Sequence, residues 1–540
     1  MWFKLYRPAP SLSAAPPLRE SADHWICPAS REPSLVEDNH FVLLGVDGAL
    51  TDVGWDGPQR EKLWRYNQHY FDDLNAKRAM ERTDWHHKLM FQWVSDNPPA
   101  SGTGWEPYPT SLRIVNWIKW SLAGNALSTD CVHSLAVQAR WLRRRLEWHL
   151  LGNHLFANAK ALIFAGLFFE GAEAANWLRC GCRILRRELP EQILEDGGHF
   201  ELSPMYHALA LEDVLDLINI IRASGASSDA ESLLAELENR VMPMLRWLKK
   251  MCHPDDELSF FNDAAFGIAP TPTELGDYAE RLGFESAKEI APESESYEAD
   301  VAINVTSLQS SGYVRIDAPN ACALLDVAPI GPDYLPGHAH ADTLSFEFSA
   351  FGQRVFVNSG TSVYGISDER LRQRGTAAHN TVTVDDTNSS EVWSGFRVAR
   401  RARPMDLAID QSSDCVRVNC GHTGYRKTVK PPVIHVREWR MKATELTIAD
   451  ELLPAVSASL HPAQARYHLH PGVTVSQQSL PSTLTLRLST GQELHVLASA
   501  PIAVEQATWH PFFGASEPTH CLVLPVDDGT VTLVVQWGNP

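Results

Sequence analysis

Apolar residues along the chain follow two different periods. From about Trp64 to Leu282 they recur at helical spacing, for example at Leu211, Val214 and Leu215, which gives each segment one apolar face. Short connections containing Gly or Pro separate these segments, as is typical of helical hairpins stacked in an array. The pattern predicts an α-helical N-terminal domain.

The period drops to two after an acidic, proline-containing stretch between Glu285 and Val301. Alternating apolar and polar residues predict strands at 311–316, 433–437, 484–488 and 530–535. The pair Asp528-Gly529 predicts a tight hairpin turn. We therefore expect a β-sandwich to follow the helical domain, and we place the two domains at residues 1–290 and 291–540.

Composition supports two domains and excludes some partners. The chain has 540 residues, too many for one ordinary core, and a hydrophobic content of 44% that is normal for a globular protein. Its formal net charge of -19 disfavours indiscriminate binding to nucleic acid or to an anionic membrane, although a local basic groove is compatible with it. No apolar stretch is long enough to span a bilayer, so we expect a soluble protein without membrane insertion.

Cysteine usage and the N-terminus both favour the cytoplasm. The nine cysteines form no framework, and Cys180 and Cys182 are the only close pair, so we interpret them as reduced thiols. The first eight residues carry charges without the apolar core that a secretory signal needs. The oligomeric state is left open.

The segment 337–342, with the sequence GHAHAD, contains the main candidate chemistry. On an extended backbone, side chains two residues apart share a face, so His338 and His340 are expected to point into one site. The alternative is a surface turn with solvated histidines. Asn358 and His379 lie at the edges of two further strand-like segments, and polar clusters at several strand ends favour a site built across a sheet.

The helical half carries two polar clusters of its own. Asn153 and His154 stand at a predicted helix start, with Asn158 four residues after His154 on the same face; a helix cap beside a partly buried histidine is the alternative. Residues 196–207 interrupt the helices with two glycines and a proline, which predicts a shaped loop. Tyr206 in this loop is either functional or a packed aromatic anchor.

Together these segments resemble the heparinase II/III-like polysaccharide lyases. Residues 63–71 (LWRYNQHYF) and 109–117 (PTSLRIVNW) are similar to segments of that family, and the clusters above follow in the family's order. The resemblance implies a multidomain α+β fold, with an incomplete (α/α) toroid followed by an antiparallel β-sandwich. It also implies a bacterial polysaccharide lyase, for which the periplasm is the alternative compartment.

The chemistry of such a lyase assigns roles to these residues. The enzyme removes the C5 proton of a 4-linked uronic acid by β-elimination, so the adjacent carboxylate must be neutralised, and Asn153 and His154 are the candidates at a helix N-terminus. Tyr206 and His338 are the candidate acid and base. Which of them is the base depends on whether the C5 hydrogen and O4 lie on the same face of the sugar, which the sequence leaves open. Tyr364 is a second candidate phenol.

The resemblance further implies a metal site. His340 corresponds to a metal ligand, with His379 and residue 358 as its partners and zinc as the usual ion. Here residue 358 is Asn, and a neutral amide is a poorer zinc ligand than a carboxylate. The sequence therefore predicts no certain cofactor, with Zn(II) or another divalent ion as the candidate. Alternatively, His340 and His379 brace the His338 strand.

Substrate recognition is expected to involve guanidinium groups and indole rings. Arg113, Arg374 and Arg397 suit carboxylates or sulfates, and Trp105 suits a sugar ring, with core packing as the alternative for the indole. The predicted partner is an acidic polysaccharide or oligosaccharide, with glycosaminoglycan, alginate and a bacterial exopolysaccharide left open. The alternative function is a non-catalytic or epimerase-like protein of exopolysaccharide biosynthesis that binds the polymer in the same cleft.

Overall fold

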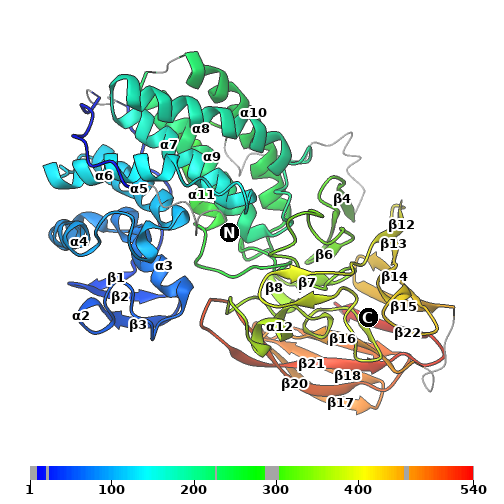
Figure 1. Ribbon diagram of the computed structural model, residues 1–540. Helices are drawn as coiled ribbons and strands as arrows, with labels where there is room; N and C mark the ends of the chain where they lie inside the picture. Colours follow the sequence, from blue (N-terminus) through cyan, green and yellow to red (C-terminus); the bar gives the residue numbers. More distant parts are fainter. Residues whose placement is uncertain (1–8, 20–23, 226–227, 286–302, 455–460, 539–540) are drawn as a thin grey trace. The chain divides into compact units, whose positions relative to one another are not determined.

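The computed structural model describes residues 9–19, 24–225, 228–285, 303–454 and 461–538 (Figure 1). They group into two compact units. The helical unit comprises Met1–Ile193, Leu209–Pro243 and Thr273–Ser286, and the β unit comprises Leu194–Ala208, Met244–Pro272 and Ala287–Pro540. Two segments that precede the predicted boundary thus group with the β unit. The boundary at residues 290 and 291 itself lies outside the described residues.

The helical unit contains one small sheet beside its helices. The sheet is antiparallel, in the order β1 (Leu35–Glu37), β2 (His40–Leu43), β3 (Val46–Ala49). The helices are α2 (Leu50–Val53), α3 (Lys62–Tyr70), α4 (Thr83–Asp96), α5 (Pro107–Leu122), α6 (Thr129–Arg143), α7 (Gly152–Phe168), α8 (Gly171–Gln192), α11 (Pro272–Arg281), most of α9 (Pro204–Ala223) and most of α10 (Ser228–Lys250).

Helix α7 forms the centre of the helical unit. Nearly all of its residues are buried, and it packs against α5 and α8. Two glycines allow the close approach of α7 and α8: a Cβ on Gly166 would lie 2.6 Å from the backbone nitrogen of Leu178, and one on Gly181 would lie 2.7 Å from the carbonyl oxygen of Ala159. The apolar surface buried between these helices is the main source of stability in this unit.

The β unit contains three large antiparallel sheets and one short hairpin. The five-stranded sheet runs β4 (Asn304–Leu308), β5 (Tyr313–Ala318), β6 (Ala321–Asp326), β7 (Phe346–Ala350), β8 (Gln353–Phe356). The eight-stranded sheet runs β12 (Pro404–Gln411), β13 (Cys415–His422), β14 (Ile434–Lys442), β15 (Glu445–Leu453), β22 (Thr530–Trp537), β19 (Glu493–Ala498), β18 (Thr483–Leu488), β17 (Val473–Leu480). The four-stranded sheet runs β20 (Ala503–Trp509), β21 (Glu517–Pro525), β16 (Ala463–His468), β9 (Val382–Val384), and the hairpin pairs β10 (Val392–Trp393) with β11 (Arg397–Val398). A short helix, α12 (Asp368–Arg374), precedes β9.

One continuous apolar core joins these sheets. Phe346, Trp439 and Leu486 belong to it and come from three different strands. Along β22 buried and more exposed residues alternate, as the sequence pattern predicts, because successive side chains point to opposite faces. The turn before β22 is also confirmed: Asp528 and Gly529 both have positive φ, as a two-residue hairpin turn requires.

The run 343–348 alternates polar and apolar residues in the sequence, but only its second half belongs to a strand. Strand β7 starts only at Phe346. Before it the chain turns, with Leu344 at φ 64° and the Ser345 amide donating to the carbonyl of Asp342 at 2.7 Å. The buried guanidinium of Arg437 binds the carbonyl of Leu344 and that of Asn380. The whole run is buried, and tertiary hydrogen bonds set where strand pairing starts.

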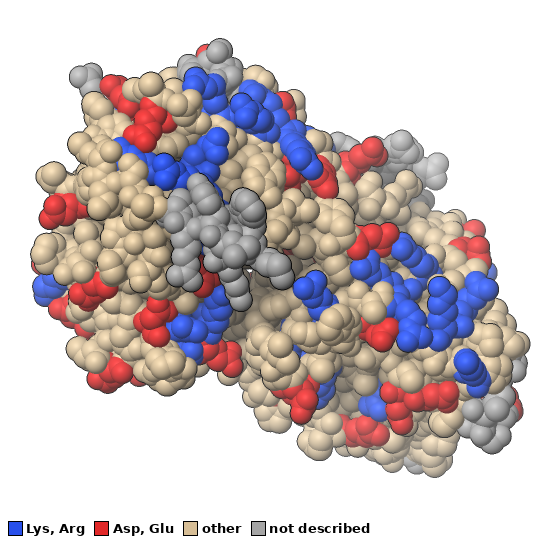
Figure 2. All heavy atoms as spheres, viewed as in Figure 1, with Lys and Arg blue, Asp and Glu red and all other residues tan. Residues whose placement is uncertain are grey.

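Three further observations concern the helices, the cysteines and the surface charge of the described chain. None of its helices combines the length and the apolar character that crossing a bilayer requires. All nine cysteines are free thiols. On the face drawn in Figure 2, acidic and basic side chains are both present on each unit, so the net negative charge does not produce a uniformly acidic surface there.

Candidate active site

Tyr206 is fixed by the start of helix α9. The Ser203 hydroxyl accepts a hydrogen bond from the Tyr206 amide at 3.2 Å, in the manner of a helix N-cap, and donates to the carbonyl of Asp263 at 2.5 Å. The Tyr206 hydroxyl lies 3.0 Å from that of Tyr364, and its ring lies 4.0 Å from the His338 ring, measured between centroids. The β unit therefore brings together three of the residues that the sequence predicts for the site.

The orientation of the His338 ring follows from its contact with Asp263. His338 Nδ1 lies 2.9 Å from Asp263 Oδ2. Because a carboxylate only accepts hydrogen bonds, Nδ1 carries the proton, and Nε2 of the neutral ring is left as an acceptor. His340 Nε2 lies 2.9 Å from the other oxygen of the same carboxylate, so both imidazoles reach one acceptor, as expected for side chains two residues apart.

Asp263 remains an anion although it is fully buried. Burial alone would raise the pKa of its carboxyl group, but Arg370 and the hydrogen bonds from His338 and His340 hold this pKa well below 3.8. Arg370 binds both carboxylate oxygens, with Nη2 at 2.7 Å from Oδ2. Sequence reasoning missed Asp263 because it lies 75 residues before His338. Its only signal is the polar pair Asn262-Asp263 inside an apolar run.

Two phenols beside this carboxylate keep their protons. Burial, the neighbouring Tyr364 and the Asp263 charge raise the pKa of Tyr206 well above 10. Burial and Asp263 also raise the pKa of Tyr364 well above that value. A protonated phenol next to an imidazole with a free Nε2 is an arrangement of one proton donor and one proton acceptor.

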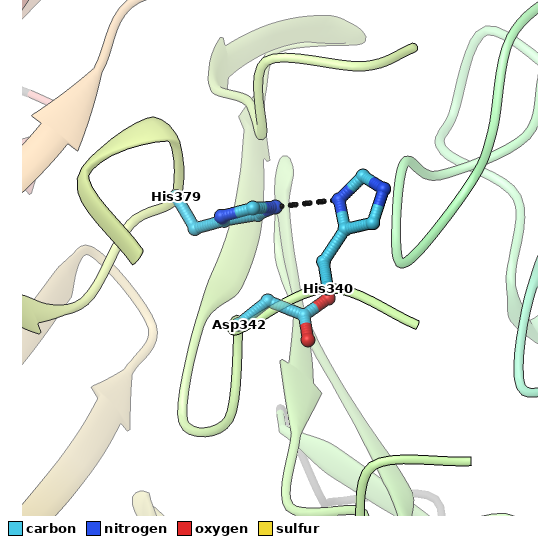
Figure 3. Close-up of side chains that lie close together, drawn as sticks. All are labelled: His340, Asp342 and His379. Atoms are coloured by element: carbon cyan, nitrogen blue, oxygen red, sulfur yellow. Dashed lines mark hydrogen bonds between the residues drawn. The ribbon is translucent and has the colours of Figure 1, made fainter. Parts of the chain in front are cut away.

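The other side of His340 faces His379. His340 Nδ1 and His379 Nε2 are 3.0 Å apart (Figure 3). His379 Nδ1 lies 2.8 Å from the Gly375 carbonyl and must donate to it, while His340 Nε2 donates to Asp263. In neutral rings the two facing nitrogens are therefore both lone pairs, and burial lowers the pKa of each histidine to about 4.

The carboxylate of Asp342 completes this donor set. Ligand atoms of His340, Asp342 and His379 all lie within 4.8 Å of one another, and all three side chains are buried (Figure 3). Burial raises the pKa of Asp342, because desolvation outweighs the attraction of His340. Two opposed imidazole lone pairs beside a carboxylate are stabilised by a shared cation, so the set fits a divalent ion such as zinc.

Asn358, which the sequence predicts as a third ligand, makes two hydrogen bonds to the backbone. Its amide nitrogen donates to the Phe260 carbonyl at 2.9 Å, and its amide oxygen accepts from the backbone of Asn380 at 3.2 Å. Both ends of the side chain are thus occupied by backbone groups. Asp342, only two residues after His340, supplies the third candidate donor instead.

Three of the predicted substrate contacts are buried, and their polar atoms bind protein groups. The Arg113 guanidinium donates to Gln138 and to two backbone carbonyls and lies over the Trp93 ring. Trp105 donates to the carbonyl of Asn97. Arg374 donates to the carbonyls of Ala339 and Gly395. These residues brace the chain, and of the predicted set only Tyr364 lies beside Tyr206 and His338.

Asn153 and His154 lie in the helical unit, in the first turn of α7 as predicted. Both are only partly buried. His154 Nδ1 lies 3.2 Å from Glu147 Oε1, and its ring lies 4.4 Å from that of Tyr108. Asn158, on the same helix face, donates to the other oxygen of Glu147 at 3.1 Å. Glu147 and Tyr108, which sequence reasoning missed, therefore fix the His154 ring and leave its Nε2 for a ligand.

Comparison with known proteins identifies the family of this arrangement. The family model for the C-terminal part of heparinase II/III-like proteins matches residues 302–537, and that for the heparinase II/III N-terminus matches residues 64–275. The chain belongs to the heparinase II/III-like family. Both halves of the predicted resemblance are thereby confirmed, in the predicted order.

Curated relatives of this heparinase II/III-like chain include two heparin-sulfate lyases. The one from Bacteroides stercoris is 29% identical over 252 residues, which is 45% of this chain and 37% of the relative. The one from Pedobacter heparinus is 25% identical over 328 residues, 57% of this chain and 47% of the relative. The matched part thus spans less than half the length of each relative.

Solved structures share the fold. A heparinase III crystal structure covers 92% of this chain and 80% of its own, with a TM-score of 0.70 at 18% identity. A chondroitin AC lyase from Streptomyces coelicolor A3 covers 88% of this chain and 75% of its own, with a TM-score of 0.52 at 11% identity. The predicted fold class, a helical N-terminal region followed by antiparallel β-sheets, is confirmed.

Proposed function

We propose that this chain is a polysaccharide lyase that cleaves a uronic-acid-containing acidic polysaccharide by β-elimination. The observation that carries the proposal is the cluster of Tyr206, His338 and Asp263 in the β unit, where a protonated phenol and an imidazole with a free Nε2 lie side by side. Relatives named heparin-sulfate lyases support the same reaction class and an acidic glycosaminoglycan as substrate.

The protonation states assign the two proton transfers. The Nε2 lone pair of His338 takes the C5 proton, and the electron pair of the broken C5–H bond forms the C4=C5 double bond. The C4–O4 bond then breaks, and the Tyr206 hydroxyl gives its proton to O4, which completes the balance of atoms and charge. Tyr206 suits the role of acid because its raised pKa keeps it protonated at neutral pH.

Asp263 positions the base. By accepting from Nδ1 it fixes the tautomer that leaves His338 Nε2 unprotonated, and it stabilises the imidazolium that forms when the C5 proton arrives. Arg370 keeps the carboxylate itself anionic.

For the helical unit we propose that Asn153 and His154 bind a carboxylate of the polymer. They stand at the N-terminus of α7, where backbone N–H groups and the helix dipole favour negative charge. Glu147 contacts His154 Nδ1 and so directs Nε2 of the ring toward a ligand. The amide of Asn153 supplies a neutral donor.

His340, Asp342 and His379 would hold a divalent cation. A bound ion would fix the His340 ring and add positive charge near Asp263, but no proton transfer is routed through it. The remaining residues carry the elimination as described.

The test is the ultraviolet absorbance of the unsaturated uronate, recorded while the purified chain acts on heparan sulfate, chondroitin sulfate, alginate and an acidic bacterial exopolysaccharide. We expect absorbance to rise with at least one polymer and the rise to be lost in Tyr206→Phe. Tyr425→Phe is the matched control, because it removes another buried phenol of the β unit, one that donates to the Val382 carbonyl.

An epimerase gives a different result in the same samples. It would exchange the C5 hydrogen with solvent deuterium and produce no chromophore, since no bond to O4 breaks. Exchange without absorbance, or neither signal with any of the four polymers, would overturn the proposal.

A further inference from the structure

The hairpin of β10 and β11 has one face packed against the candidate active site. Val392 and Val398 are paired across the hairpin and pack with Ile330 and Ala339 in a small apolar cluster. Ala339 is the residue between His338 and His340. The inner face of the hairpin is therefore seated on the segment that carries both histidines.

Main-chain contacts fix the turn of the hairpin. Arg370 Nε donates to the Gly395 carbonyl at 3.1 Å, and Arg374 Nη1 donates to the same oxygen at 3.0 Å. A Cβ on Gly395 would lie 2.4 Å from the carbonyl oxygen of Gly365, so only glycine allows this approach. Because Arg370 also binds Asp263, one side chain holds the hairpin turn and the carboxylate that orients His338.

The outer face presents aromatic rings and a guanidinium to solvent. Trp393 and Arg397 are cross-strand partners, which places their side chains on the same face. Trp393 is 52% exposed and Phe396 40% exposed. The Phe396 ring lies 5.2 Å from the Tyr364 ring and 6.0 Å from the His338 ring, so this surface is continuous with the candidate active site.

Arg397 differs from the neighbouring arginines in its ion pairing. Arg400 pairs with Glu391, and Arg401 and Arg403 pair with Asp333. Arg397 is exposed and forms no ion pair with any residue that the structure describes. About half of the Trp393 indole and the Arg397 guanidinium are therefore open to solvent on one face of the hairpin.

We propose that Trp393 and Arg397 form a binding subsite for an anionic sugar residue adjacent to the one that is cleaved. The flat indole contacts the apolar C–H face of a pyranose ring, and the guanidinium binds a carboxylate or sulfate on the same sugar. Phe396 lines the path from this subsite to Tyr364 and His338. The inference rests on the proposed function and adds a specificity determinant to it.

The test compares steady-state kinetics of the full chain and of Trp393→Ala and Arg397→Ala on heparan sulfate or whichever acidic polymer of the panel is cleaved. Each substitution should raise KM about tenfold and change kcat less than about twofold, because the contact is made equally before and during the reaction. The Arg397→Ala effect should shrink as sodium chloride is raised, whereas the Trp393→Ala effect should not.

Matched controls are Phe91→Ala, at an exposed aromatic on α4, and Arg487→Ala, at an exposed arginine on β18 that pairs with Glu493 on β19. Both should leave KM unchanged. Elimination by the wild-type chain with unchanged KM in the two hairpin variants would overturn the subsite and leave the proposed function standing.

If the wild-type chain shows no elimination, the proposed function fails, and calorimetric titration with size-defined heparan sulfate oligosaccharides decides the subsite separately. Weaker binding by both hairpin variants supports it. Equal binding by variants and wild type, or no binding by any of them, overturns it.

Discussion

A buried ion-pair cluster of the helical unit and a set of buried histidines in the β unit respond to burial in opposite ways. In the helical unit, the ammonium groups of Lys119 and Lys160 lie 3.0 Å and 2.6 Å from Asp216 Oδ2, and all three side chains are buried. The Lys160 pKa is raised, because Asp213 and Asp216 outweigh the effect of burial. In the β unit, burial instead lowers the pKa of several histidines to about 3 or 4: His199, His207, His340, His379 and His468.

The two kinds of buried group have different roles: ion pairs stabilise the fold, and neutral imidazoles can take part in proton transfer. Fixed ion pairs keep their charge across the whole neutral range, so they hold helices together without exchanging protons. Neutral buried imidazoles keep a lone pair, and so they can accept a proton or a cation. Neither unit holds one kind alone, because burial also lowers the pKa of His69 in the helical unit to about 3, and the β unit contains the buried ion pair of Arg370 with Asp263.

The largest expected effect is on the stability of the helical unit. Asp216→Asn leaves two buried ammonium groups with a neutral partner, and breaking a buried ion pair typically costs about 3–5 kcal/mol of unfolding free energy. Urea unfolding followed by hydrogen exchange in peptides of α7 should show this loss. Asp213→Asn is the control, since Asp213 is partly exposed and binds only Lys160. A loss under about 1 kcal/mol for Asp216→Asn would mean that the pair is solvated.

The second largest expected effect is a loss of kcat when the proton-transfer residues of the β unit are replaced. Tyr206→Phe and His338→Ala should each lower kcat at least ~10²-fold while polymer binding and the melting temperature stay near wild type. The double variant should be little worse than either, because the two residues serve one reaction step. Losses that multiply would show that the two side chains act in separate steps.

Zinc binding is expected to have a smaller effect, on the stability of the folded chain. From the neutral Asn358, the sequence predicts weak zinc binding at best, but the position of Asp342 changes that expectation. Zinc at about 100 times its Kd should stabilise the chain by about 2.7 kcal/mol, seen as a higher melting temperature. Asp342→Asn should abolish both the shift and the bound zinc found by elemental analysis. Asn358→Asp should not raise zinc content, and a gain there would return residue 358 to the ligand set.

Acid should weaken the β unit first. His207 and His468 have folded pKa values of about 3, below the ordinary 6.5, so the unfolded chain binds more protons between these values. Their stabilising contribution is complete above pH 6.5 and is lost as the pH falls toward 3. Hydrogen exchange at pH 7 and pH 5 should show protection falling more in peptides of β16 than in those of α7. Equal loss in both would contradict the comparison.

The sequence predicted what depends on local pattern. Period-3.6 and period-2 runs identified the fold class, and the spacing of His338 and His340 predicted that both rings reach one place, which the shared contact with Asp263 bears out. Tyr206 was found because glycine and proline interrupt a helical pattern. These signals require only neighbours along the chain.

What the sequence missed depends on contacts between distant segments. Asp263 reaches His338 across 75 residues, and Arg370 reaches Asp263 across 107. Arg113 and Trp105 have the right chemistry for a sugar acid, but nothing local indicates that the fold buries them. The backbone hydrogen bonds of Asn358 could not be predicted for the same reason, because the orientation of an amide side chain follows from the backbone groups around it.

The anchoring of the β10 and β11 hairpin has a consequence for how substrate preference can change. Arg370 and Arg374 donate hydrogen bonds to the backbone carbonyl of Gly395. Every amino acid has such a carbonyl, so the turn keeps its position whatever side chains stand at 393 and 397. Randomising these two positions should give a library in which nearly every member folds. Selection for activity on a new polymer would then act on substrate binding alone, because the substitutions leave the stability of the fold unchanged.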